Sequence, residues 1–196
     1  MRTGVLALQG AFREHINILK KYNMETVEIR LPSQLQNIDG LIIPGGESTT
    51  ISKLIIEYNF PDKIKEFSSS GKPIFGTCAG SILLADKIEG KRQEFLNLID
   101  IDIKRNAYGR QVSSREVELD IEFLGPEPFR AIFIRAPIIE GMGPDVIPLA
   151  YYKDKVVLAR QNNILVSTFH PELTRDARIH GYFLDMIRVR CEKSTA

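Results

Sequence analysis

Five residues, Gly76-Thr77-Cys78-Ala79-Gly80, constrain the fold of this chain more than any other stretch. Residues 72–75 before them form a short apolar segment that predicts a buried strand, and residues 81–85 after them predict the first turns of a helix. A strand that turns abruptly into a helix holds the residue at the turn in a strained conformation with its side chain projecting. Glycines two positions before and two after that residue remove the side chains that would collide in so tight a turn.

The pattern predicts a nucleophile elbow that displays Cys78 at a helix N-terminus, where the helix dipole and free backbone N–H groups favour a thiolate. The alternative is a buried structural cysteine between two loop glycines. The five residues alone do not decide between these interpretations, so the choice depends on what else the chain places near Cys78.

Strands and helices alternate through the first half of the chain. Apolar segments predict short strands over residues 5–8, 26–31, 40–43 and 73–76. Apolar residues at helical spacing predict helices over about 11–23, over 51–58 and then up to about residue 70. This alternation is typical of a parallel sheet in a doubly wound α/β fold.

The pattern changes after about residue 90. Residues 99–103 and 117–123 alternate between apolar and polar side chains, which predicts half-exposed strands. Further strand candidates cover 131–134, 147–152, 155–161 and 164–169, and a final helix covers about 175–190. We therefore expect one domain over residues 1–196, with an open, mostly parallel doubly wound sheet flanked by helices and extended by antiparallel strands in the C-terminal half.

Composition narrows the class of protein. Hydrophobic residues make up 43% and charged residues 26% of the 196 residues, values that are typical of a soluble globular domain. The net charge of +1 argues against a nucleic acid or a membrane surface as partner. Two distant cysteines indicate neither a zinc site nor a disulfide framework, so we expect no metal and a reduced, cytoplasmic setting.

A cysteine nucleophile needs a base, and the chain has only three histidines. His15 lies among charged residues, so we expect it on the surface, and His180 is expected to be solvated or to pack between helices. His170 ends an apolar strand and is followed by Pro171-Glu172, and strand C-termini are where open α/β sheets assemble their sites. Beside the elbow, we interpret His170 as the base and Glu172 as the carboxylate that orients its imidazole. The alternative is a capped strand end with a solvated glutamate.

A thiolate that attacks a carbonyl group also needs donors for the oxyanion that forms. The backbone N–H of Ala79 in the elbow is one candidate. The loop 44–48 is expected to supply another, because its paired glycines Gly45 and Gly46 let the backbone turn an N–H toward a ligand. The alternative is a plain turn from strand to helix with Ser48 as N-cap. A phosphate-binding loop is disfavoured because the Gly-Lys-Ser/Thr ending is missing.

Taken together, Gly-Thr-Cys-Ala-Gly, the Gly-Gly-Glu-Ser loop and the late His-Pro-Glu resemble the class I (triad) glutamine amidotransferase family. More narrowly, the chain is similar to the glutaminase subunits of two-component pyridoxal 5′-phosphate synthases. That similarity rests on residues 5–12, 44–50, 76–80, 105–111, 133–137 and 168–172, which span nearly the whole chain. One departure is Ser113-Ser114-Arg115-Glu116, where the family usually has an acidic residue and then an aromatic one.

The resemblance implies a role for each matching residue. Cys78 is the implied nucleophile, His170 the acid and base, and Glu172 the group that orients His170. The implied oxyanion hole consists of backbone N–H groups at Gly46 and Ala79. The implied pocket for L-glutamine is made by Gly46, Glu47, Ser48, Arg105, Ile134 and Arg135. An arginine suits the α-carboxylate of glutamine because it can bind it through two hydrogen bonds, although both arginines alone would be interpreted as surface residues.

The implied reaction is the hydrolysis of glutamine to glutamate and ammonia through a γ-glutamyl thioester on Cys78. Ammonia would pass to a separate synthase subunit, and pyridoxal 5′-phosphate would be a product of the complex rather than a cofactor of this chain. Three alternatives remain: a glutaminase subunit of another pathway such as histidine biosynthesis, a cysteine-elbow protein of the peptidase or stress-response type, and a non-catalytic partner module. Ala79 disfavours the first two, which usually have a bulkier residue or a histidine at that position.

Overall fold

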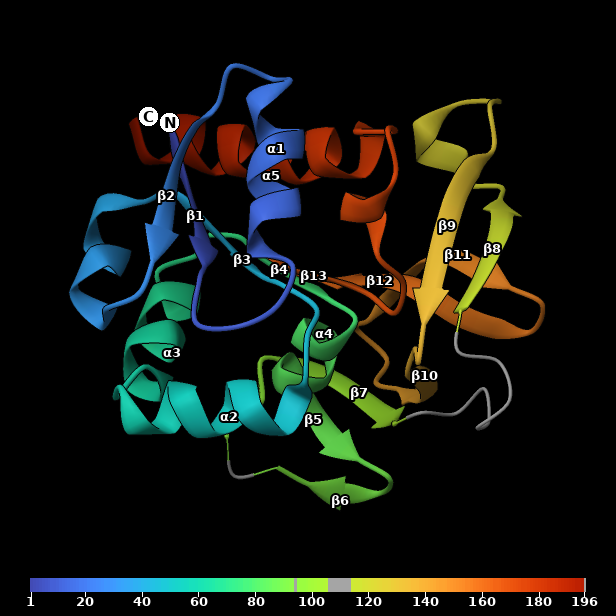
Figure 1. Cartoon of the computed structure of the whole chain (residues 1–196), viewed down its shortest axis with the longest axis horizontal. Coiled ribbons are helices and arrows are strands. Elements are labelled where there is room, and N and C mark those ends of the chain that lie inside the picture. Colours follow the sequence, from blue (N-terminus) through green and yellow to red (C-terminus); the bar gives the residue numbers. More distant parts are fainter. Residues whose placement is uncertain (94, 106–113, 196) are drawn as a thin grey trace.

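The computed structural model of the chain describes residues 1–93, 95–105 and 114–195. Its main element is a seven-stranded sheet in the order β11-β12-β13-β4-β3-β1-β2 (Figure 1). The strands of this sheet are β1 Arg2–Leu6, β2 Glu25–Ile29, β3 Gly40–Ile43, β4 Ile74–Thr77, β11 Ile147–Tyr152, β12 Lys155–Gln161 and β13 Ile164–Ser167. The five strands from β13 to β2 are parallel, whereas β12 and β11 run antiparallel to their neighbours. The predicted fold class is confirmed.

Helices cover both faces of this sheet, as a doubly wound fold requires (Figure 1). On one face lie α1 Phe12–Lys20 and α5 Arg178–Thr195, and on the other lie α2 Ser48–Glu57, α3 Pro61–Ser69 and α4 Ala79–Leu84. Short 3₁₀ turns cover η1 Pro32–Asn37, η2 Glu122–Leu124 and η3 Pro171–Leu173. The expected final helix begins three residues later than predicted, because Thr174 and Asp176 hold a turn in front of it.

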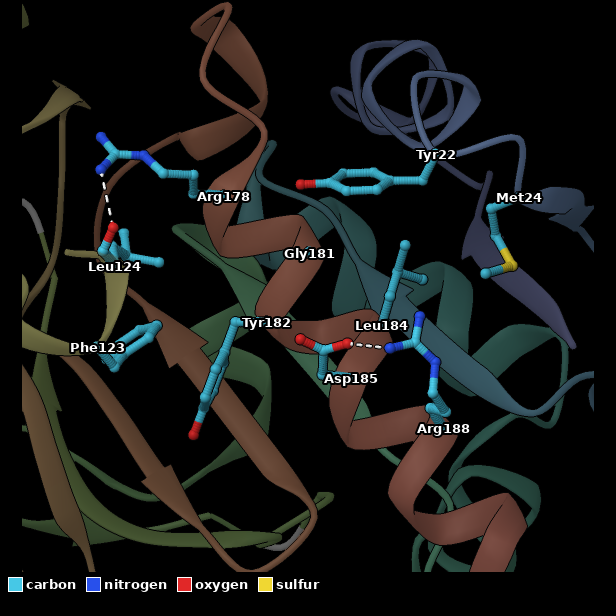
Figure 2. A pocket seen from close by; sticks show the side chains of 10 residues that line it. All are labelled: Tyr22, Met24, Phe123, Leu124, Arg178, Gly181, Tyr182, Leu184, Asp185 and Arg188. Atoms are coloured by element: carbon cyan, nitrogen blue, oxygen red, sulfur yellow. Dashed lines mark hydrogen bonds and ion pairs between the residues drawn. The ribbon is translucent and has the colours of Figure 1, made fainter. Parts of the chain in front are cut away.

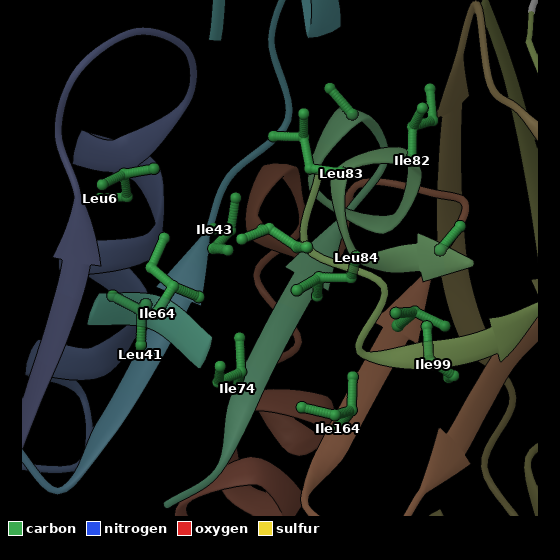
Figure 3. Close-up of a cluster of buried hydrophobic side chains, with 14 of the residues drawn as sticks. Leu6, Leu41, Ile43, Ile64, Ile74, Ile82, Leu83, Leu84, Ile99 and Ile164 are labelled. Atoms are coloured by element: carbon green, nitrogen blue, oxygen red, sulfur yellow. The ribbon is translucent and has the colours of Figure 1, made fainter. Parts of the chain in front are cut away.

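The sheet separates the buried core into two layers because successive side chains of a strand point to opposite faces. On β3, Leu41 and Ile43 join the layer beneath α2, α3 and α4, whereas Ile42 joins the layer beneath α1 and α5. On β4, Ile74 and Phe75 divide in the same way. Figure 3 shows the first layer, in which side chains of α3 and α4 meet those of the central strands.

The second half of the chain differs from the expected extension of the main sheet. Strands β5 Ala85–Ile88, β6 Lys91–Arg92, β7 Ile99–Lys104 and β10 Ile138–Met142 form a separate sheet in the order β10-β7-β5-β6. A third, two-stranded sheet pairs β8 Ser114–Leu119 with β9 Phe129–Ile134. The predictions for 99–103 and 131–134 were therefore right about strands but wrong about their sheet, because an alternating pattern tells which face is buried and not which strand is the neighbour. The predicted strand 117–123 is right only as far as Leu119, because the 3₁₀ turn η2 begins at Glu122.

The parallel strands bring three loops to one edge of the main sheet. In the register of the sheet, Ser167 of β13 lies beside Thr77 of β4, and Gly76 of β4 lies beside Ile43 of β3. The segments that follow β13, β4 and β3 therefore emerge next to one another. They carry the His-Pro-Glu sequence, the elbow and the Gly-Gly-Glu-Ser loop.

Candidate active site

Cys78 lies between β4 and α4 with φ of 48° and ψ of −104°, a backbone conformation that residues other than glycine rarely adopt. The flanking glycines are required by close backbone contacts. A Cβ atom on Gly80 would lie 2.0 Å from the carbonyl oxygen of Ile43, and one on Gly76 would lie 2.7 Å from the backbone of Gly80. The structure thus has the strand, strained turn and helix that the elbow interpretation predicts.

His170 and Glu172 lie just beyond the end of β13, beside the elbow. The backbone N–H of His170 donates to the carbonyl oxygen of Ile132 in β9 at 2.8 Å. Its ring atom Nδ1 lies 2.7 Å from Oε1 of Glu172, a distance at which an N–H donates to the carboxylate. Both side chains are buried, which excludes the alternative of a solvated glutamate.

The imidazole of His170 is strongly biased toward its protonated form. Burial alone lowers its pKa, but hydrogen bonds to Cys78 and Glu172, together with the negative charges of those groups, raise the pKa to about 10. An imidazolium beside a cysteine favours the thiolate, which is the nucleophilic form. His170 therefore interacts with Cys78 on one side and with Glu172 on the other.

The loop between β3 and α2 approaches this group through Gly45. A Cβ atom on Gly45 would lie 2.5 Å from Cε1 of His170 and 3.2 Å from Cβ of Cys78. The Gly45 backbone is bonded on both sides, because its N–H donates to Oγ1 of Thr77 at 3.1 Å and its carbonyl accepts the N–H of Ala11 at 2.9 Å. In a trans peptide the N–H of Gly46 points away from that carbonyl, and hence away from Ala11.

Glu47 is the N-cap of α2. Its carboxylate accepts the N–H groups of Thr49 at 2.9 Å and Thr50 at 2.7 Å, so it caps α2, and these bonds with the Thr50 hydroxyl lower its pKa to about 2. The alternative expectation of Ser48 as N-cap is wrong, because Ser48 is already the first residue of the helix. The carboxylate of Glu47 is therefore occupied, and its backbone N–H donates to Oε1 of Gln9.

The other expected pocket residues come from β7 and β9. The carbonyl oxygen of Ile134 lies 3.8 Å from Sγ of Cys78, and the exposed Arg135 that follows has φ of 43°. Arg105 follows β7, and its Nε is buried with no hydrogen-bond partner among the described residues. The rest of its motif, 106–111, lies outside the described residues. So does Ser113, the first residue of the tetrapeptide 113–116 that differs from the family pattern. Arg115 of that tetrapeptide donates to the hydroxyl of Tyr152 at 3.0 Å and lies over its ring.

Sequence reasoning missed three polar residues beneath the site, namely Gln9, Thr77 and His15. The expectation that His15 lies on the surface is wrong, because its side chain is fully buried, as is that of His180. The helical spacing of the sequence could have predicted that His15 is buried, because His15, Ile18 and Leu19 share the buried face of α1. For His180 the structure selects packing between helices over solvation.

A separate pocket of about 350 Å³ lies between α5, the end of α1 and η2 (Figure 2). None of the expected site residues lines it. Its charged groups already have partners, since Arg178 donates to the carbonyl of Leu124 and Arg188 to Asp185. Within the described ranges, no three His, Cys, Asp or Glu side chains are grouped as metal ligands, and no helix is long and apolar enough to cross a membrane.

Comparisons with known proteins agree with this geometry. Residues 5–189 match the model of the SNO glutamine amidotransferase family. The chain is 56% identical over 187 residues to the pyridoxal 5′-phosphate synthase subunit PdxT of Moorella thermoacetica, which covers 95% of this chain and 100% of the relative. It is 50% identical over 188 residues to PdxT of Thermotoga neapolitana, covering 96% of this chain and all of that one.

Solved structures give the same result. The crystal structure of a glutamine amidotransferase superposes with a TM-score of 0.89 at 46% identity, over 94% of this chain and 98% of the other. The structure of PurLQS from Thermotoga maritima superposes with a TM-score of 0.70 at 18% identity, over 94% of this chain and 97% of the other, a likeness of fold alone.

Proposed function

The chain belongs to the SNO glutamine amidotransferase family, and from this membership we propose that it is the subunit that hydrolyses L-glutamine in a pyridoxal 5′-phosphate synthase. One observation supports the chemistry above all others: Cys78 in its strained elbow and His170 both lie against Gly45, and His170 is hydrogen-bonded to Glu172. The relatives at 50–56% identity are named as PdxT subunits of pyridoxal 5′-phosphate synthase. These names favour a role in vitamin B6 biosynthesis over a glutaminase of histidine biosynthesis. The whole chain, 1–196, serves as one glutaminase domain in this proposal.

The reaction begins with the thiolate of Cys78. It attacks the side-chain carbonyl carbon of glutamine, so that a C–S bond forms and the carbonyl oxygen becomes an oxyanion held by N–H groups at Gly46 and Ala79. His170 gives its proton to the departing nitrogen, the C–N bond breaks, and ammonia leaves a γ-glutamyl thioester on Cys78. Glu172 stabilises the imidazolium and holds its tautomer throughout.

Water completes the cycle. His170, now neutral, takes a proton from water as the water oxygen attacks the thioester carbonyl. Collapse of this second intermediate breaks the C–S bond, releases glutamate and restores the thiolate beside an imidazolium. Both half-reactions use the same oxyanion donors, so the site needs no metal or cofactor in this scheme.

The α-carboxylate and α-amino groups of glutamine fix its position. We assign the carboxylate to Arg105 and Arg135, because a guanidinium matches a carboxylate with two hydrogen bonds and the buried Nε of Arg105 lacks a partner among the described residues. The backbone of Ile134 and of Gly46, Glu47 and Ser48 completes the pocket. Glu47 takes part through its backbone, since its carboxylate caps α2.

Ammonia released into water would be protonated and lost as a nucleophile. A synthase subunit that docks over the site is the acceptor, and the reaction takes place in the cytoplasm without nucleic acid or membrane. This assignment is tested by mixing the chain with its synthase subunit and measuring glutamate and pyridoxal 5′-phosphate together. Both products should form from glutamine, and Cys78→Ala should form neither from it.

A glutamine-analogue electrophile tests the nucleophile directly. It should attach to Cys78 and spare Cys191, which lies in α5 and is only partly buried. Mass spectrometry of the digested protein locates the label. Labelling of Cys191, or glutamate release by Cys78→Ala, would show that the nucleophile is misassigned.

A further inference from the structure

Two buried histidines that the reaction scheme does not use lie directly behind the site. His15 on α1 and His180 on α5 are both fully buried, with Nδ1 of His15 and Nε2 of His180 2.9 Å apart. Both helices lie on the same face of the main sheet (Figure 1), and both rings form T-shaped pairs with Phe75 in β4, three residues before Cys78. Two histidine side chains thus occupy positions where a core normally holds apolar groups.

Both rings are neutral. Burial, then His180 and His170, lower the pKa of His15 well below its ordinary value. Burial, then Lys21, lower the pKa of His180 to about 3. A neutral imidazole carries a hydrogen on one nitrogen only, so each contact of these rings depends on which nitrogen carries it.

The second nitrogen of His15 faces the catalytic group. Its Nε2 lies 3.1 Å from Oγ1 of Thr77 and 3.5 Å from Oε2 of Glu172. That oxygen is buried and has no hydrogen-bond partner in the described part of the chain, whereas Oε1 of the same carboxylate is bonded to His170. A lone pair on Nε2 would face this negative oxygen, while an N–H there would complement it.

The contact with His180 favours the same arrangement. If Nε2 of His15 carries the hydrogen, its Nδ1 accepts from Nε2–H of His180, and Nδ1 of His180 is left as a bare acceptor. That atom has no partner among the described residues. The opposite arrangement would give the Thr77 hydroxyl an acceptor, but it would bury an unpaired N–H on His180 and leave Oε2 of Glu172 facing a lone pair.

Thr77 extends the network to the loop beside the nucleophile. Its Oγ1 accepts the backbone N–H of Gly45 at 3.1 Å as well as contacting His15. Gly45 in turn lies against His170 and Cys78, where no side chain would fit. One imidazole therefore touches both the orienting carboxylate and the residue that anchors the loop.

We propose that His15 is a positioning residue of the catalytic triad. Its Nε2–H, fixed in that tautomer by His180, supports the free oxygen of Glu172 and, through Thr77, holds the Gly45 backbone beside Cys78. This proposal rests on the proposed glutamine hydrolysis, but it predicts a tautomer that can be observed without any turnover.

The tautomer is measured by nitrogen NMR of the imidazole rings in the resting protein. The chain has only three histidines, so the spectrum holds six ring nitrogens, and a His180→Met variant assigns that ring. We expect His15 to show a protonated Nε2 and an unprotonated Nδ1 at neutral pH. A protonated Nδ1 with a bare Nε2 would overturn the proposal, whatever the enzyme's activity.

Kinetics of two variants test the function of that N–H. His15→Met removes the donor, whereas His15→Gln keeps an amide N–H at similar reach. We expect His15→Met to lower kcat for glutamine about tenfold or more, with KM changed by less than about threefold, because the lost contact orients Glu172 rather than substrate. We expect His15→Gln to recover most of that kcat.

A matched control separates positioning from packing. Leu19 lies on the same buried face of α1 and makes only apolar contacts, so Leu19→Met disturbs the packing of the helix without removing a donor. It should keep kcat within about twofold even where it lowers the melting temperature as much as His15→Met does. If His15→Met keeps the kcat of the wild type, or if the Gln and Met variants lose equally while both remain folded, His15 is only a core residue. If the wild-type complex releases no glutamate, the proposed function fails instead.

Discussion

Cys78 is held in a strained conformation by its backbone contacts. Its N–H donates to the carbonyl oxygen of Ser167 at 2.8 Å, and its carbonyl accepts from the N–H and the hydroxyl of Ser81. A residue in a sparsely populated φ/ψ region costs on the order of 1–3 kcal/mol, so these buried bonds offset the strain that aims the thiol outward. The bond from the N–H of Cys78 also ties the elbow to β13, the strand that leads to His170.

Glu172 is the residue whose charge the triad depends on most directly. Glu172→Gln keeps the size of the side chain but removes the negative charge that stabilises the imidazolium. We expect kcat to fall at least about 100-fold with little change in KM, as steady-state glutamate release would show. Glu140→Gln is the control and should leave kcat unchanged, because the carboxylate of Glu140 pairs with Lys104 on the surface. Normal turnover in Glu172→Gln would exclude Glu172 from the triad.

The raised pKa of His170 predicts how stability depends on pH. Because folding raises this pKa from 6.5 to about 10, the protonated ring stabilises the fold fully below about pH 6.5 and loses that effect as the pH rises to about 10. Each pKa unit corresponds to about 1.4 kcal/mol, so the loss should reach a few kcal/mol.

Urea unfolding of the wild type and of His170→Gln measures this effect. The stability advantage of the wild type should shrink between about pH 6.5 and 10, since the variant has no ring to deprotonate. A difference that stays constant over this range would show that His170 is neutral in the resting enzyme.

At the scale of secondary-structure elements, the elbow depends on the approach of α4 to β3. A Cβ atom on Gly80 would lie 2.0 Å from the carbonyl oxygen of Ile43, and backbone cannot move aside as a flexible side chain does. Gly80→Ala should therefore displace α4, lower the free energy of unfolding by about 2 kcal/mol or more, and lower kcat further by moving Cys78.

Gly141→Ala in β10 is the matched substitution. Its added Cβ atom would meet only Cβ of Asp102 at 3.6 Å, an ordinary contact, so stability should change by less than about 0.5 kcal/mol. Chemical denaturation and glutamate release are measured on both variants. Equal effects at Gly80 and Gly141 would show that α4 and β3 are not closely packed there.

Elements with a local signal were predictable from the sequence. The parallel strands are short and apolar throughout because both of their faces are covered, and this made β3 and β4 recognisable, with the elbow directly after β4. The grouping of β5, β6, β7 and β10 into a second sheet was not predictable, because strand partners are chosen by contacts far apart in sequence. Cys78, His170 and Glu172 could be proposed as site residues from the sequence because each follows a predicted strand or turn.

His15 was missed for a different reason. Its charged neighbours suggested a surface position, yet one face of an amphipathic helix is buried whatever the adjacent residues are. The polar contacts of His15 join α1, β4 and η3 across the fold. Only the assembled structure brings these groups together.

At the scale of the whole molecule, the chain must couple glutamine hydrolysis to an acceptor on another subunit. The peptide between Gly45 and Gly46 suits this purpose. Among the described residues its carbonyl accepts one hydrogen bond, from the N–H of Ala11 at 2.9 Å, and glycines on both sides let the peptide rotate at little steric cost. Rotation would replace the N–H of Gly46 with a carbonyl, and losing one oxyanion donor typically costs about 10²–10³ in turnover.

We therefore predict that the isolated chain is a poor glutaminase and that the docked synthase subunit stabilises the productive peptide. Titrating the chain with that subunit at saturating glutamine should raise glutamate release at least about tenfold, to a plateau at a fixed ratio of subunits. Ala11→Pro sharpens the test, because Ala11 already has φ of −81°, which proline accepts, and proline replaces the N–H that holds the Gly45 carbonyl with a ring carbon that pushes this carbonyl away. This variant should have lower turnover alone and a larger relative activation by the partner. Full activity in the isolated chain, unchanged by the partner or by Ala11→Pro, would show that the peptide is already fixed and that docking does not control it.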